Sequence, residues 1–231
     1  MPSFELVILQ LDPDVPAGVF TELLSEWQVP FRIVRVDGGE NLPDSADAVI
    51  VLGGAMGVHD EEEFPFLCAV KAFMRRMLDR GTPLFGICLG GQLLADVAGG
   101  TVSSNCCGEK GVVAVEVTEI GVADPLFAGM TGPLPIYQWH NDSFTVPPGA
   151  LHLAESTACP GQAFRLGNAW GVQFHPEVDT AIVALWSKDA PDHAVHVAEF
   201  AEAEPEHRQL ARRMLGNFLT AAGMRSRTLQ G

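Results

Sequence analysis

The chain is short of basic side chains. Of its 231 residues, 14 are Lys or Arg and 29 are Asp or Glu, which gives a formal net charge of −15. Proteins that bind nucleic acid gather Lys and Arg to neutralise phosphates. We therefore expect no nucleic-acid partner, and the excess of acidic charge favours solubility.

Cysteine is scarce, with five residues of which two are adjacent. An odd number in this arrangement does not form the disulfide framework of a secreted protein. The seven histidines are scattered without ligand spacing, so the sequence predicts no metal site and no cofactor. We interpret four of the cysteines as inert, buried small hydrophobes: Cys68, Cys106, Cys107 and Cys159.

Long apolar runs are absent as well, so we expect no contact with a membrane. The first residues, MPSFELVILQLD, lack a positively charged leader and are interpreted as a first strand rather than a signal peptide. Together with the unpaired cysteines, this favours a reducing compartment, and we expect the protein to be cytoplasmic.

The apolar pattern of the first hundred residues alternates between strand and helix. Such alternation predicts an α/β fold with a doubly wound, flavodoxin-like and mostly parallel sheet, covered by helices on both faces. Strand-like runs lie at 4–11, 31–36, 47–52 and 83–87, and helical patterns at 16–27, 65–80 and 90–98.

Beyond residue 100 the pattern changes to short strands separated by turns, which predicts an antiparallel edge over 101–175. The segment 178–231 is expected to form a C-terminal helical wrap within a single domain of residues 1–231. Helical patterns lie there at 178–187, 192–203 and 205–222. Pro205 is predicted to open the last helix.

Cys88 lies where an apolar strand meets a helix-forming stretch without a linker, in PLFGICLGGQLLA. Glycines at 86, 90 and 91 permit a sharp turn of the kind called a nucleophile elbow. The positive end of the helix dipole then favours a thiolate, and free backbone N–H groups are available to an oxyanion. We predict that Cys88 is the nucleophile of an acyl-transfer reaction.

A cysteine nucleophile needs a histidine to carry its proton and a third group to orient that histidine. In NAWGVQFHPEV, strand alternation places His175 and Glu177 on the same side of the backbone. The predicted catalytic triad is therefore Cys88, His175 and Glu177. Taken alone, His175 could be an ordinary strand-end histidine, and Glu177 could be a solvated carboxylate or a helix cap.

An oxyanion hole is expected from a second loop. The apolar strand of DAVIVLGGAMGVHD leads directly into Gly53 and Gly54. We assign the backbone amides of Gly54 and Leu89 to the oxyanion hole, although the two glycines could also form only a tight turn. Such a turn would still lie at the ligand edge of the sheet.

Together, GICLGGQ, the Gly-Gly loop and FHPE resemble the class I glutamine amidotransferases, over residues 5–177. GGAMGVHD, QWHNDSF and CPGQAFR are most similar to the stand-alone, GMP-synthase-like branch of that family. The resemblance implies hydrolysis of the γ-glutamyl amide of glutamine through a glutamyl thioester on Cys88. It also implies substrate contacts from Gln92 and from a loop comprising Trp139, His140, Asn141 and Asp142. His140 could instead simply pack beside Trp139, and Asp142 could be a turn residue.

Hydrolysis of the γ-glutamyl amide would release ammonia, and the sequence does not identify the molecule that accepts it. The chain contains no GxxxxGK[ST] loop and leaves no room for an ATP-binding domain, so we expect no synthetase within it. The protein could pass ammonia to a separate synthetase subunit, or it could be a stand-alone γ-glutamyl hydrolase or peptidase. A catalytically silent binding protein is disfavoured by the complete triad.

Overall fold

A nine-stranded sheet runs through the computed structural model, which describes residues 4–224. One part of the sheet is parallel and has the order β2-β1-β3-β4-β11. These strands are β1 (Leu6–Gln10), β2 (Phe31–Arg35), β3 (Ala48–Val51), β4 (Leu84–Ile87) and β11 (Ala169–Val172). This order is the flavodoxin-like one, and it confirms the predicted fold class.

The remaining strands extend the sheet from β11 in antiparallel fashion, in the order β10-β9-β6-β7, as predicted for the edge. They are β6 (Glu109–Val117), β7 (Leu134–His140), β9 (Leu151–Glu155) and β10 (Ala163–Leu166). A separate two-stranded ribbon, β5 (Val102–Ser103) with β8 (Ser143–Phe144), was not predicted. Strands of two residues are too short to show a period.

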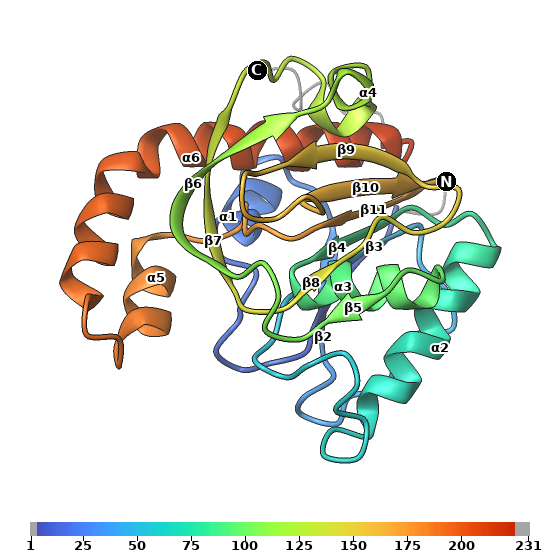
Figure 1. Cartoon of the computed structure of the whole chain (residues 1–231). Coiled ribbons are helices and arrows are strands. Elements are labelled where there is room, and N and C mark those ends of the chain that lie inside the picture. The colour runs from blue at the N-terminus through green and yellow to red at the C-terminus, as the bar shows by residue number, and fades with distance from the viewer. Residues whose placement is uncertain (1–3, 225–231) are drawn as a thin grey trace.

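Helices cover both faces of the sheet (Figure 1). In β1, Leu6 and Ile8 pack with α1 (Val19–Glu26) and α6 (His193–Ala221), whereas Val7 and Leu9 pack with α2 (Phe66–Asp79) and α3 (Leu89–Val97). Strands buried on both faces read as continuous apolar runs, which is why the sequence revealed them. The remaining helices are the short α4 (Glu119–Val122), the 3-10 turn η1 (Pro125–Phe127) and α5 (Thr180–Ser187).

The prediction of two helices at 192–203 and 205–222 is wrong, because α6 continues through Pro205. A proline inside a helix removes one hydrogen bond and costs about 3 kcal/mol. Here the helix is buried on both sides of the proline: Phe200 packs against Tyr137 of β7, and Phe218 against Phe85 of β4. Tertiary packing therefore holds α6 together where local preference favours a break.

Within residues 4–224, no helix combines the length and the apolar composition needed to cross a bilayer. The 29-residue α6 is long enough, but its composition is mixed.

Candidate active site

Cys88 stands between β4 and α3 as the N-cap residue of the helix, with φ 49° and ψ −109°. Positive φ is uncommon for a residue with a Cβ, and it costs on the order of 1–3 kcal/mol, which the surrounding structure must impose. The Cys88 carbonyl accepts a hydrogen bond from the Gln92 N–H at 2.8 Å, so the helix begins directly at the cysteine. The side chain is thus held at the N-terminus of α3.

Three glycines let α3 lie close to the strands. A Cβ at Gly90 would lie 2.1 Å from the Val51 carbonyl oxygen, one at Gly91 would lie 2.5 Å from that of Val172, and one at Gly86 would lie 2.4 Å from that of Gly90. These are contacts with backbone, which cannot move aside. The residue with the strained backbone is Cys88 itself, since none of the three glycines has a positive φ. The glycines instead allow the close approach of helix and strands that positions Cys88.

Replacing Gly90 with alanine should therefore destabilise the fold by about 3 kcal/mol or more, because the new methyl group would overlap the Val51 carbonyl. Urea denaturation would measure the loss in the free energy of unfolding. Gly38→Ala is the matched control, since its Cβ would meet nothing nearer than 3.4 Å and Gly38 is exposed. Equal stabilities of the two variants would contradict the close approach.

His175 and Glu177 follow β11 and are both buried. The Nδ1 atom of His175 lies 2.8 Å from Oε1 of Glu177. The predicted proximity is thus present, but β11 ends at Val172, so a turn rather than strand alternation brings the two side chains together. The His175 N–H donates to the Tyr137 carbonyl at 2.9 Å, which ties this segment to β7. Trp186, near the end of α5, packs edge-on against the imidazole with the ring centres 4.7 Å apart. The imidazole is therefore fixed in position and in ring orientation.

Two charges determine the protonation of His175. Burial alone would lower its pKa, because it disfavours the charged imidazolium. The Glu177 carboxylate opposes this, as does the charge on the Cys88 sulfur, and together they raise the pKa of His175 to about 10. Cys88, His175 and Glu177 are thus coupled, and the histidine carries a proton at neutral pH.

A cavity of about 370 Å³ opens onto Cys88 and His175. This volume lies within the range of small-molecule sites. Every residue predicted to bind substrate lines it: Gln92, Trp139, His140, Asn141 and Asp142.

The predicted oxyanion loop borders the two catalytic candidates. A Cβ at Gly53 would lie 3.2 Å from Cε1 of His175 and 3.6 Å from Cβ of Cys88. Within residues 4–224, the backbone N–H groups of Gly54 and Leu89 donate to no protein acceptor. They therefore remain available to a ligand in the cavity.

Two of the predicted substrate-binding side chains are already engaged by the protein. Gln92 Nε2 donates to the Asp142 carbonyl at 3.0 Å and to Oε1 of Gln173 at 3.2 Å. Among residues 4–224, no donor is bound to Oε1 of Gln92. The ring of His140 contacts the Asp142 carbonyl through Nδ1 at 3.0 Å, and its Nε2 lies 3.6 Å from Glu109. The protein thus engages Nδ1 of His140, while Nε2 faces Glu109.

Three residues of the site were missed from the sequence. Gln173 is fully buried, with Nε2 3.6 Å from the Cys88 sulfur. Asp12 follows β1 and accepts hydrogen bonds from the N–H groups of Asp14 and Ala55, both at 2.9 Å. Trp186 lies on α5. A signal existed for the first two, since Gln173 is a polar residue within an apolar run that includes β11, and Asp12 follows the carboxyl end of β1.

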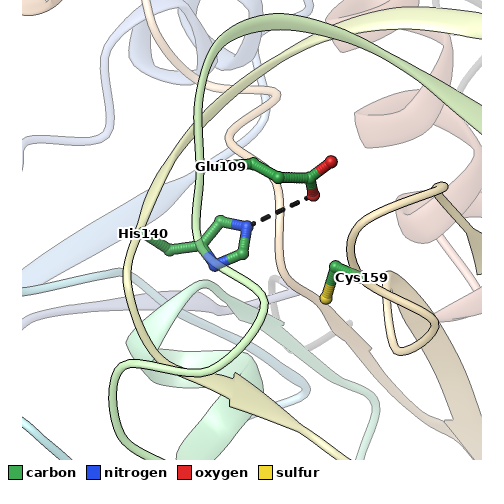
Figure 2. Close-up of side chains that lie close together, drawn as sticks. All are labelled: Glu109, His140 and Cys159. Carbon is green, nitrogen blue, oxygen red and sulfur yellow. Dashed lines mark ion pairs between the residues drawn. The ribbon is translucent and has the colours of Figure 1, made fainter.

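A second cysteine, histidine and glutamate also lie together: Cys159, His140 and Glu109 (Figure 2). These are the residue types of a thiol triad, but their arrangement differs from one. In a triad one imidazole nitrogen faces the carboxylate and the other faces the sulfur. Here His140 Nε2 faces Glu109, while Nδ1 is held by a backbone carbonyl.

Cys159 also lacks the surroundings of a reactive thiol. Burial raises its pKa to about 11, which keeps the group a neutral thiol. It does not border the cavity at Cys88 and lies at no helix N-terminus. Of the other cysteines predicted to be buried and inert, Cys68 and Cys106 are in fact exposed.

The family model of the class I glutamine amidotransferases matches residues 19–181, and the chain belongs to this family. The glutamine amidotransferase-like protein YfeJ of Salmonella typhimurium is 35% identical over 168 residues, which cover 70% of each protein. The GMP synthase of Aeropyrum pernix is 38% identical over 146 residues, which make up 61% of this chain but 26% of that enzyme. The chain thus spans about a quarter of that relative.

Solved structures agree with the fold. A glutamine amidotransferase from Thermotoga maritima superposes with a TM-score of 0.86 at 26% identity, covering 97% of this chain and all of the other. A protein of the same description from Methylobacillus flagellatus reaches 0.84 at 24% identity, with 95% of each chain covered, and supports the fold alone. The predicted resemblance to this family is confirmed.

Proposed function

We propose that this protein hydrolyses the γ-glutamyl amide of glutamine through a glutamyl thioester on Cys88. The observation that carries the proposal is the buried imidazole of His175, coupled to the Cys88 sulfur and held 2.8 Å from the Glu177 carboxylate at the edge of a cavity. A nucleophile at a strained helix N-terminus, a proton carrier and an orienting carboxylate are the parts that cysteine-based acyl transfer requires.

In the proposed reaction the Cys88 thiolate attacks the γ-amide carbonyl and forms a tetrahedral intermediate. The N–H groups of Gly54 and Leu89 hold the oxyanion, and one such donor contributes about 3 kcal/mol. Protonated His175 gives its proton to the leaving ammonia, and the thioester forms. His175 then takes a proton from water, which attacks the thioester and releases glutamate and the free thiolate. Glu177 keeps the imidazole oriented throughout.

The substrate would be held by the cavity wall formed by Trp139, Asn141 and Asp142, with Gln92 Oε1 as an additional acceptor. Since both nitrogens of the His140 ring are directed elsewhere, His140 would contribute through its backbone and by shaping this loop. This loop would recognise the α-amino and α-carboxylate groups of the substrate.

Two fates of the released ammonia remain in the proposal. The GMP synthase relatives are named as glutamine-hydrolysing enzymes, and this chain would correspond to a glutaminase subunit that supplies a separate synthetase. YfeJ, of which the match covers 70%, is named as a glutamine amidotransferase-like protein. The alternative is that this chain acts as a stand-alone γ-glutamyl hydrolase or peptidase. In either case five free thiols, one of them the nucleophile, suit the reducing cytoplasm.

Glutamate release by the purified protein tests the proposal, with glutamine and a panel of γ-glutamyl amines and peptides as substrates. The Cys88→Ala variant is the control for glutamate release that does not depend on Cys88. Cys88-dependent release from the panel with poor use of glutamine supports the stand-alone hydrolase, and release from glutamine supports the glutaminase subunit. Cys88-independent release, or no release and no acylation of Cys88 by any of these compounds, would overturn the proposal.

Asp12 should act as a positioning residue for the oxyanion loop. Asp12→Ala removes the acceptor that holds the Ala55 N–H next to Gly54, so we expect kcat to fall by about 10–100-fold with little change in KM. Steady-state kinetics with glutamine would separate the two constants. Asp47→Ala is the matched control. Asp47 accepts the Glu5 N–H at 2.8 Å next to the start of β1, whereas Asp12 follows the end of that strand. An equal loss of kcat in both variants would show that the effect comes from general destabilisation and would contradict the positioning role of Asp12.

A further inference from the structure

A buried group of potential metal ligands lies behind the substrate loop. Glu109 begins β6, and His140 ends β7 directly opposite it in the ladder. Cys159 comes from the turn between β9 and β10. Their side chains gather in one place, with one ligand atom from each within 4.8 Å of the others (Figure 2). The side chains of Glu109 and His140 are 7% and 1% exposed, and Cys159 is fully buried.

His140 is oriented as a metal ligand would be. Its Nδ1 lies 3.0 Å from the Asp142 carbonyl, which can only accept, so Nδ1 carries the proton and Nε2 presents a lone pair in the neutral ring. Nε2 is buried and finds no hydrogen-bond partner among residues 4–224, although it lies 3.6 Å from the Glu109 carboxylate. An imidazole that donates one N–H to a backbone carbonyl and presents the other nitrogen is the usual arrangement of a metal-bound histidine.

The other two ligands are also held in place by their neighbours. Glu109 accepts hydrogen bonds from Ser156 Oγ at 2.8 Å and from Gln162 Nε2 at 2.5 Å. Ser156 Oγ in turn accepts from the Cys159 N–H at 3.0 Å and fixes the turn that carries the sulfur. A second shell of this kind orients the first-shell atoms of metal sites.

We propose that Glu109, His140 and Cys159 bind a zinc-like divalent cation that clamps the substrate loop to the antiparallel edge of the sheet. Binding of the cation would displace the proton of the Cys159 thiol. Thiolate, imidazole and carboxylate are ligands of zinc, at about 2.0–2.3 Å from the metal. Tetrahedral geometry with those bonds separates ligand atoms by about 3.3–3.8 Å. The His140 to Glu109 distance of 3.6 Å already fits, and separations of up to 4.8 Å need side-chain shifts of about 1 Å.

The proposed cation would act on the loop rather than on the reaction. The Asp142 carbonyl that holds His140 also accepts from Gln92, so one backbone group joins the metal site to the cavity wall. Three protein ligands leave a fourth position for a water molecule. The sequence could not show this site, because ligands 31 and 19 positions apart have no local spacing.

Cobalt binding tests the proposal independently of hydrolysis. The full chain would be stripped with a chelator under a phosphine reductant and titrated with Co²⁺, whose thiolate complexes absorb by charge transfer. We expect one equivalent to bind, with a charge-transfer band that Zn²⁺ abolishes. Cys159→Ser should remove the band. Its affinity for Co²⁺ should fall by more than the 10–100-fold or so that loss of a second-shell partner costs.

Control variants locate the bound metal. Cys88→Ser and the double variant Cys106→Ser, Cys107→Ser should keep the band, since none of these thiols belongs to the site. If Cys159→Ser fails to fold, Glu109→Gln, which keeps the shape of the side chain, should weaken Co²⁺ binding while retaining the band. Absence of stoichiometric binding, or a band that depends on Cys88 or on Cys106 and Cys107, would overturn the proposal.

Discussion

Replacing Cys88 with alanine should lower kcat/KM for γ-glutamyl amide hydrolysis by at least about 10⁴-fold, because no other group can form the thioester. The fold should persist, since alanine keeps the Cβ and therefore the same backbone strain at φ 49°. Glutamate release measured alongside circular dichroism would separate loss of chemistry from loss of structure.

Acid quenching followed by mass spectrometry of the intact protein and of its peptides shows which cysteine is acylated. We expect a glutamyl adduct on the peptide that contains Cys88 in the wild type and in Cys68→Ser, a control at an exposed cysteine. The Cys88→Ser variant should show no such adduct on a thiol. An adduct on Cys159 with Cys88→Ser still active would show that the second Cys-His-Glu group is the catalytic one.

Replacing Glu177 with glutamine should lower kcat/KM by about 10²–10⁴-fold and shift the basic limb of its pH profile to lower pH. The Glu177 carboxylate is the largest contribution that raises the pKa of His175, to about 10, against the effect of burial. His175 is therefore protonated below about pH 10 in the wild type, and loses its proton at lower pH once the carboxylate charge is removed. His175→Ala should block acylation altogether.

The pH profile distinguishes this role from a structural one. The groups that influence His175 are Glu177, the Cys88 sulfur and the buried His207, so a shift produced by Glu177→Gln is attributable to the carboxylate. Glu116→Gln, at an exposed carboxylate on β6, should leave the profile unchanged. An unshifted basic limb in Glu177→Gln, or wild-type rates in both triad variants, would contradict the assignment.

The parallel half of the sheet and its helices were predictable because their patterns are strong and local. β1, β3 and β4 are buried on both faces and read as continuous apolar runs, and α2 shows one apolar face. The predicted break at Pro205 is wrong because long-range packing, which leaves no local pattern, outweighs the local preference of proline. The packing of Phe200 and Phe218, which carries α6 through the proline, joins residues distant in the sequence.

The candidate site likewise contains some residues that the sequence predicted and others that it did not. Cys88 lies between a strand and a helix that are contiguous in the chain, and His175 and Glu177 are two positions apart, so spacing alone placed each in its local setting. Trp186 gave no local signal, and the signals of Asp12 and Gln173 were weak. Their contacts with Ala55, Cys88 and His175 join separate segments of the chain.

By itself, the sequence determined the elbow around Cys88, the proximity of His175 and Glu177, and membership of the amidotransferase family, because short-range geometry and spacing decide these features. Only the tertiary structure decided that His175 is buried next to the Cys88 sulfur and the Glu177 carboxylate, whose charges raise its pKa to about 10 against the effect of burial. It alone also brought Glu109, His140 and Cys159 together. Burial and distances across a sheet depend on strand order, which is a property of the whole chain.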